Sequence, residues 1–222
     1  MKTNQLYKNA ALAALKGNWA QAVVATIVLL AITYAIVLPY VAVTPTTADT
    51  ESGPMFFVLI TMAVYILAMI LVYYPLSVGY MYATNRLCAE SDNRLTGNMM
   101  RDGFKPWGRN VWGMFLMGLF VFLWSLLLFI PGIIKAYAYA LTPYILIDNP
   151  ELSANQAINL SRKMMKGHKF DMFCLHLSFI GWVILNIFTL GIGMLWLMPY
   201  IATAQAAFYQ DIKNEYLRID SK

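Results

Sequence analysis

The sequence predicts an all-α membrane protein with six transmembrane helices arranged as three hairpins, and with amphipathic helices along its inner surface. Hydrophobic residues make up 60% of the chain and charged residues only 12%, whereas an ordinary soluble domain has about 25% charged residues. The apolar residues come in long uncharged runs, and a run of about 18 or more is typical of a membrane-spanning helix. All but one of the 16 Lys and Arg residues lie outside these runs, in segments that can all face the same side of the membrane.

The first hairpin is expected to have its spans at 19–43 and 55–83. A basic stretch before it is expected to form a short interfacial helix that ends at Gly17; a frayed tail is the alternative. The polar loop 44–54 between the spans has two acids and no basic residue. The second span contains Pro75, and its length requires a tilt, a kink or an extension beyond the membrane.

The second hairpin follows the polar connection 85–110, which carries five basic residues. Its spans are expected at 111–130 and 133–147, joined by a sharp turn at Pro131-Gly132, and the second span contains Pro143. Lys135 follows this turn by about one helical turn. Two interpretations stay open for Lys135: its amine snorkels to the outer headgroups, or it is an intramembrane partner for a substrate anion.

An amphipathic helix is expected over 150–166, between the second and third hairpins. The polar run Asp148–Glu151 has the residue types that start a helix. The methionine-containing face is expected to enter the membrane interface. The basic residues are expected to contact lipid phosphates or a partner protein; the alternative is that they only anchor the topology. These basic residues are Arg162, Lys163, Lys166 and Lys169.

The third hairpin is expected at 170–190 and 194–209, with a turn at 191–193 and Pro199 in its second span. His176 and Asn186 are polar residues inside its first span. Hydrogen bonding between helices is the ordinary role of such residues. A polar cavity or a proton path is the alternative for His176.

The three returning helices have a common pattern, because Pro75, Pro143 and Pro199 each stand beside a Tyr. The outgoing helices also begin alike, with LKGNW, FKPWGRNVW and MKGHKF. This pattern favours three copies of one hairpin; general constraints on membrane helices are the alternative explanation. A Pro within a span frees a backbone carbonyl, which a neighbouring helix, a hydroxyl or water must satisfy.

Orientation follows from the distribution of positive charge, because cytoplasmic loops carry the excess of Lys and Arg. Both termini, the connection 85–110 and the segment 148–169 hold every basic residue except Lys135. The sequence therefore predicts a multi-pass protein of a cytoplasmic membrane with both termini inside.

The second half of the chain carries a family resemblance. Its residues are PGIIKAYAYALTPYILIDNPELSANQAINLSRKMMKGHKF, followed by LSFIGW, LGIG and PYIATAQAAFY. This sequence resembles an uncharacterised bacterial integral-membrane family catalogued as domain of unknown function 975, and LKGNW near the N-terminus fits it as well. The family is similar in layout to membrane domains attached to glycerophosphodiester phosphodiesterases. The resemblance implies a bacterial cytoplasmic-membrane protein with several spans, and it brings no established activity.

Residues for catalysis are scarce. The sequence has no plausible Ser-His-acid set, no HExxH motif and no phosphate-binding Gly loop. Its two cysteines, Cys88 and Cys174, have no His/Cys cluster at zinc-ligand spacing. We therefore expect no enzyme activity, no cofactor and no metal. Nucleic acid is not an expected partner, because basic residues beside a membrane more simply meet anionic lipid.

The function expected from these observations is that of a non-enzymatic membrane protein that binds membrane lipids, anionic headgroups among them, or a membrane-protein partner. The alternative is a small transporter or exporter of a peptide, a lipid or another amphiphile. That alternative rests on the three prolines and on His176 and Asn186 within spans, and it requires a polar cavity near the middle of the membrane.

Overall fold

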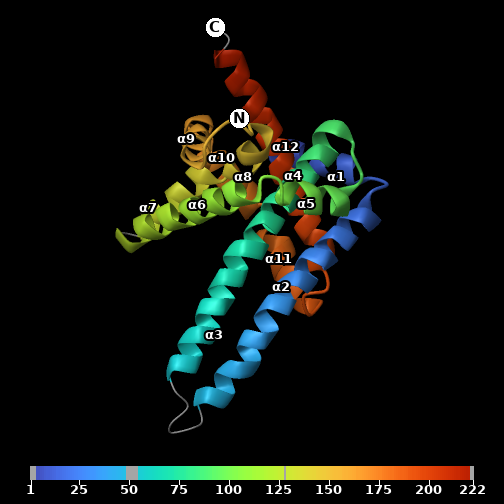
Figure 1. Cartoon of the computed structure of the whole chain (residues 1–222). Coiled ribbons are helices and arrows are strands. Elements are labelled where there is room, and N and C mark those ends of the chain that lie inside the picture. Colours follow the sequence, from blue (N-terminus) through green and yellow to red (C-terminus); the bar gives the residue numbers. More distant parts are fainter. Residues whose placement is uncertain (1–3, 49–54, 128, 221–222) are drawn as a thin grey trace.

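The computed structural model describes residues 4–48, 55–127 and 129–220, in which every regular element is a helix (Figure 1). The prediction of an all-helical chain is thus confirmed for these residues. The predicted loop 44–54 starts inside a helix, because α2 continues to Ala48, and 49–54 lie outside the described residues. The helices are α1 Asn4–Leu15, α2 Trp19–Ala48, α3 Met55–Ala68, the π-helix η1 Met69–Tyr73, α4 Tyr74–Glu90, α5 Leu95–Gly103, α6 Trp107–Leu127, α7 Phe129–Tyr139, α8 Thr142–Asp148, α9 Ala154–Met164, α10 Lys169–Leu177, α11 Ile180–Phe188 and α12 Met194–Asp220.

Among the described residues, 5 stretches are long and apolar enough to cross a membrane, which is compatible with a multi-pass membrane protein. They correspond to the first five predicted spans. The sixth predicted span, 194–209, is the first part of α12 and is not among them, because no described stretch of α12 is both long and apolar enough. The 5 stretches are Trp19–Ala42, Phe57–Glu90, Trp107–Leu126, Ile130–Asp148 and Lys169–Phe188.

Each of three short helices packs on one other helix that precedes or follows it in the chain. Helix α5 packs on α4, α9 packs on α8, and α1 packs on α12 at the other end of the chain. The hydroxyl of Tyr7 in α1 donates to the carboxylate of Asp211 in α12 at 2.9 Å. The helix that follows each short helix contacts the next short helix: α2 touches α5, α6 touches α9, and α10 touches α1.

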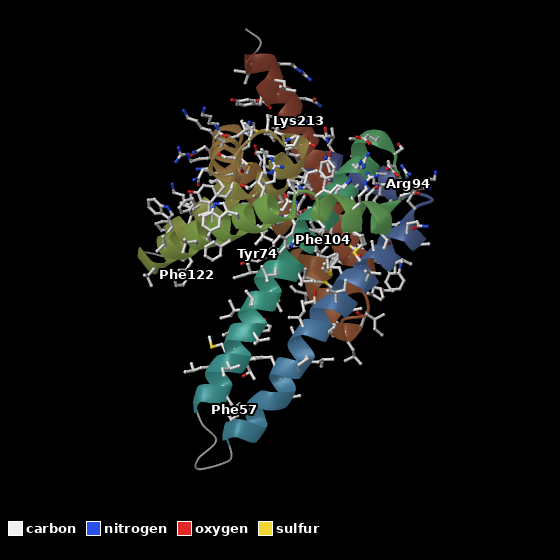
Figure 2. All side chains as sticks on the ribbon, viewed as in Figure 1. Phe57, Tyr74, Arg94, Phe104, Phe122 and Lys213 are labelled. Atoms are coloured by element: carbon white, nitrogen blue, oxygen red, sulfur yellow. The ribbon has the colours of Figure 1, made fainter. Side chains whose placement is uncertain are left out.

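Helices α2 and α3 form an arm that projects from the rest of the molecule (Figure 1). Only the base of α2 is buried, at Ala22, Ala25 and Leu29 among others, and no residue from 57 to 68 is buried. Figure 2 shows charged side chains gathered at the opposite end, with Arg94 and Lys213 there and Phe57 at the far end of α3. An apolar arm without charge or cover is the form that a lipid environment requires.

The arm is joined to the body through a very close crossing of α4 and α5. A Cβ added at Gly79 would lie 2.1 Å from the carbonyl oxygen of Met99, and one added at Gly103 would lie 2.3 Å from that of Pro75. Only residues without a side chain let the two backbones approach this closely. Small residues at helix contacts are common in membrane proteins for the same reason.

The three prolines lie at different helical positions. Pro75 is in the first turn of α4, directly after the π-helix η1, and Pro143 is in the first turn of α8. Pro199 lies inside α12. The carbonyl that Pro75 leaves without its helical donor belongs to Leu71, and it accepts a hydrogen bond from the indole N–H of Trp107 at 2.9 Å. Helix α6 thereby holds the π-helix η1, which continues from α3.

Candidate functional site

Helix α9 is the element that positions the candidate site. It begins at Ala154, four residues after the predicted start at 150, because Ser153 is its N-cap. The Ser153 hydroxyl accepts from Gln156 N at 3.3 Å, and the Gln156 side chain accepts from Ser153 N at 2.8 Å. This reciprocal capping box fixes the helix start more firmly than the acidic run before it.

Asp148 therefore has another role than starting this helix. Its side chain is 8% exposed, and its carboxylate accepts from the Tyr209 hydroxyl at 2.6 Å and from the Lys213 ammonium at 2.5 Å. The ring of Tyr209 also stacks on that of Tyr144, with centroids 4.8 Å apart. Asp148 thus ties the end of α8 to α12, while Glu151 is exposed.

One face of α9 is buried in the protein rather than presented to lipid. Ala157, Ser161 and Met164 are buried, and Met164 and the following Met165 belong to the main hydrophobic core. The expectation that the methionine-containing face enters the membrane interface is therefore wrong. The apolar residues of this face are part of the hydrophobic core, so the face packs on the other helices.

Ser161 fastens α9 to the second helix pair. Its hydroxyl donates to the carbonyl of Ala138 at 3.0 Å and accepts from the backbone N–H of Leu141 at 3.2 Å. Both partners lie at the break between α7 and α8, where backbone groups lack their helical partners. A single buried hydroxyl thus fixes the height at which α9 lies along this pair.

A hollow of about 270 Å³ opens between α6, α7 and α9. Four of its lining side chains are polar and four are largely apolar. The ammonium of Lys135 lies 4.3 Å from the ring centroid of Trp124, a cation–π contact. The polar lining residues are Lys135, Asn155, Asn159 and Arg162, and the others are Phe120, Trp124, Tyr139 and Ile158.

The polar groups of this hollow are available for a ligand. Within the described parts of the chain, the side chains of Asn155, Asn159 and Arg162 make no hydrogen bond or ion pair. None of the lining residues is acidic, so the two cations have no counter-charge inside the hollow. Arginine binds phosphate or carboxylate oxygens through two parallel hydrogen bonds, and lysine adds a compact charge. The arrangement is suited to an anion.

The four basic residues singled out in the sequence are not brought together here. Lys163 and Lys166 are exposed and line no part of this hollow, and Lys169 is half-buried at the start of α10. Only Arg162 faces the hollow, and it is joined there by Lys135 of α7. The sequence reasoning missed Asn155 and Asn159. Their spacing of four residues, with Arg162 three further on, places all three on one stripe of a helix and was the signal for them.

His176 and Asn186 lie apart from this hollow. The His176 ring joins three helices, with Nδ1 3.3 Å from the hydroxyl of Tyr137 and Nε2 2.5 Å from the amide nitrogen of Gln205. Asn186 donates to the sulfur of Met194 at 2.9 Å. Asn186 also lines a second hollow, of about 470 Å³, whose other residues include Trp19, Trp182 and Trp196.

Potential metal ligands do not form a metal-binding group among the residues that the structure describes. No group of three or more His, Cys, Asp or Glu there is placed to hold a metal ion. Cys88 and Cys174 are free thiols. His168 lies near two carboxylates, with ring nitrogens 3.4 Å from Asp171 and 3.6 Å from Glu215, which ties the start of α10 to α12.

Comparison with known proteins gives a family and no function. No curated protein and no solved structure matches the chain. Residues 109–216 match the family model described as "Protein of unknown function (DUF975)". This stretch contains all the residues that line the 270 Å³ hollow, whereas LKGNW near the N-terminus lies outside it. The similarity to the DUF975 family is therefore carried by residues 109–216, just under half of the chain.

Proposed function

We propose that this chain is a non-enzymatic protein of the bacterial cytoplasmic membrane that binds the phosphate of an anionic phospholipid between α6, α7 and α9. The observation that carries the proposal is that Lys135 and Arg162, from two different helices, line one hollow without an acidic neighbour. A phosphate in this hollow would neutralise both cations. The amides of Asn155 and Asn159 offer further hydrogen-bond donors beside them.

A lipid fits this hollow better than a soluble anion because apolar side chains share its lining with the polar groups. On the opposite side of α6, Phe122 and Leu126 are 62% and 75% exposed, and apolar surface of this extent needs a lipid or protein cover. The hollow itself contains Phe120, Trp124 and Ile158. A phospholipid presents a phosphate and acyl chains together, and so it matches both kinds of surface at once.

We also propose that the chain enters the membrane as three hairpins with inner-surface helices and with both termini in the cytoplasm. The contacts of the short helices support this layout, because α5, α9 and α1 hold equivalent places on α4, α8 and α12. The basic residues outside α7 support the orientation. Six complete crossings stay a prediction.

The contacts within the spans favour lipid binding over transport. The transporter hypothesis requires a polar cavity that includes His176 or Asn186. His176 is engaged by Tyr137 and Gln205, and the hollow beside Asn186 is mainly apolar. A membrane-protein partner at the exposed basic residues stays an alternative occupant of that surface.

The proposal is tested by measuring bound lipid in two variants of equal charge. Lys135→Gln with Arg162→Gln removes both cations of the hollow, and Lys163→Gln with Lys166→Gln removes two exposed cations outside it. Each protein is placed in nanodiscs that contain phosphatidylglycerol and phosphatidylcholine, and the retained anionic lipid is counted by native mass spectrometry. We expect a loss of about tenfold in the first variant, which corresponds to about 1.4 kcal/mol, and little change in the second. Equal losses in both variants, or no loss in the first, would refute a specific site.

A further inference from the structure

We infer that the α6–α7 hairpin does not cross the membrane but turns back on the surface that holds α9. The observation is the shared hollow: Lys135, close to the tip of this hairpin, and Arg162 of the basic helix α9 line the same space of about 270 Å³. The inference does not depend on whether a lipid occupies the hollow. It depends on where α9 can lie relative to the membrane.

Helix α9 cannot lie within the hydrocarbon layer. Arg162, Lys163 and Lys166 are all exposed on it or directly after it, together with Asn155 and Asn159. A Lys or Arg at the centre of a spanning helix makes insertion unfavourable. The buried face of α9 cannot offset this cost for three such residues, because that face already packs against protein. Helix α9 therefore lies at a membrane surface.

The tip of the hairpin lies close to the level of α9. The Ser161 hydroxyl binds the carbonyl of Ala138. Helix α7 begins at Phe129, so Pro131 and Gly132 lie inside a helix and do not form the predicted turn, and Phe129 is only nine residues before Ala138. Nine helical residues span about 14 Å, whereas the hydrocarbon layer is about 30 Å thick. Packing of Ile158 with Leu116 and Tyr139 holds α9 along both helices of the hairpin. The tip therefore cannot reach the far surface while α9 stays at the near one.

The charge distribution agrees with this placement. In the six-span prediction, Lys135 is the one basic residue on the outer side. A hairpin that turns back places Lys135 in the same headgroup layer as Arg162, and all 16 basic residues then share one side. The exposed side chains of Phe122, Leu126 and Ile130 would enter the acyl chains of the near leaflet, as in interfacial helices.

Two of the candidate membrane spans overlap this hairpin. The stretches Trp107–Leu126 and Ile130–Asp148 have the length and composition to cross a membrane, but those two properties do not determine the direction in which a helix lies. The contacts with α9 supply that direction. The chain would then cross at α2, at α3–α4, and through the third pair, with the second pair lying in one leaflet.

The test is the side from which single cysteines react with a charged, membrane-impermeant methanethiosulfonate reagent. The background carries Cys88→Ala and Cys174→Ala. Lys135→Cys is the probe, and a trimethylammonium reagent restores the positive charge on modification. Lys163→Cys marks the side of α9, and Asp49→Cys, between α2 and α3, serves as the reference for the other side. Labelling is compared in intact cells and in inverted membrane vesicles.

We expect Lys135→Cys and Lys163→Cys to react at least tenfold faster in inverted vesicles than in intact cells, and Asp49→Cys to show the reverse. Reaction of Lys135→Cys from the side of Asp49→Cys would overturn the inference. So would a lack of reaction from both sides, because the inference places this residue in the hydrated headgroup layer. Ser125→Cys, whose side chain is exposed near the same tip, replaces Lys135→Cys if that variant does not accumulate. Anionic lipid counts from the nanodisc experiment are read separately, so the two proposals can fail independently.

Discussion

The α2–α3 arm and the α6–α7 arm are both pairs of apolar helices, but the molecule attaches and covers them differently. The first arm has no cover along α3, and it joins the body through the glycine crossing of α4 and α5. The second arm is covered on one side by the basic helix α9. It is joined through polar side chains, Arg109 at its base and Ser161 along its length. Similar apolar composition therefore does not imply a similar place in the membrane.

The two attachments support the inference that the two arms lie differently in the membrane. A helix with lipid on all sides is free to cross, because nothing polar is fastened to it. A helix that carries a charged neighbour along one face must stay where that neighbour stays, since the cost of moving the charges exceeds the gain from crossing. The predictions below test the two attachments, beginning with the attachment of the first arm.

The largest effect is expected for Gly79→Ala, which attacks the attachment of the first arm. The added Cβ would lie 2.1 Å from the backbone oxygen of Met99, so the two helices must separate. We expect a loss of about 3 kcal/mol in the free energy of unfolding, measured by unfolding in detergent micelles. Gly118→Ala is the control, because its Cβ would meet only the Tyr74 hydroxyl at 3.7 Å. Equal stability of both variants would mean that α4 and α5 are not in this close contact.

A smaller effect is expected for Arg109→Ala, at the base of the second arm. The guanidinium donates to the carbonyls of Asn149 and Leu152 at 3.0 Å, and also to those of Leu146 and Pro150. Its removal leaves carbonyls at the end of α8 without donors. We expect a loss of about 2 kcal/mol in the same unfolding assay. Arg109→Lys should recover part of it, and full stability of Arg109→Ala would show that water replaces the guanidinium.

Ser161→Ala is expected to loosen the second arm without unfolding the protein. It removes the hydrogen bonds to Ala138 and Leu141, for a loss of about 1 kcal/mol, and it should speed amide hydrogen exchange in α9. Ser125→Ala is the matched control, because the Ser125 hydroxyl binds only the carbonyl of Val121 in its own helix. Identical exchange in α9 for the two variants would count against the role of Ser161 as a fastener.

Much of the fold was predictable because membrane-spanning helices require long runs of residues without charge. Their positions agree with five structural stretches to within a few residues, apart from the extension of the second to Glu90. The sixth differs because every stretch of α12 long enough to cross a membrane includes polar residues such as Gln205 and Gln210. The start of α9 differs because the choice between two capping sequences depends on which one completes its hydrogen bonds.

The candidate site was only partly predictable. Lys135 was recognised as the exception to the charge distribution and Arg162 as one of four basic candidates, but their meeting depends on tertiary packing of α9 along α6 and α7. Sequence periodicity tells which residues share a face, and it does not tell which helix covers that face. The role of Arg109 was missed for a similar reason. A basic residue in a polar connection looks solvated, whereas this one binds the carbonyls that end α8.

The smallest expected effect is a pH dependence confined to the attachment of the first arm. Asp92, between α4 and α5, accepts from the Arg94 side chain at 3.2 Å, from Asn98 at 2.9 Å and from the Arg94 backbone at 3.1 Å. These hydrogen bonds hold the pKa of the Asp92 carboxyl well below its usual range, which is about 3.9 for an unfolded chain. A lowered pKa in the folded state stabilises the fold above the unfolded pKa, and this contribution is lost as the pH falls below about 4.

Asp92→Asn should therefore lower stability at neutral pH, where the ionised carboxylate contributes, and should reduce the further loss in acid, so that the variant and the unchanged protein converge at about pH 3. The measurement is the unfolding midpoint in micelles between about pH 7 and about pH 3. The effect should also shrink at high salt, because the Arg94 side chain is 74% exposed and solvent screens its charge. Glu151→Gln is the control, since this exposed carboxylate lies in the segment before α9 and makes no hydrogen bond in the described chain. If both variants shift the acid midpoint equally, the carboxylate at the α4–α5 junction has no special part in holding the first arm, and the contrast between the two attachments is reduced to the glycine crossing alone.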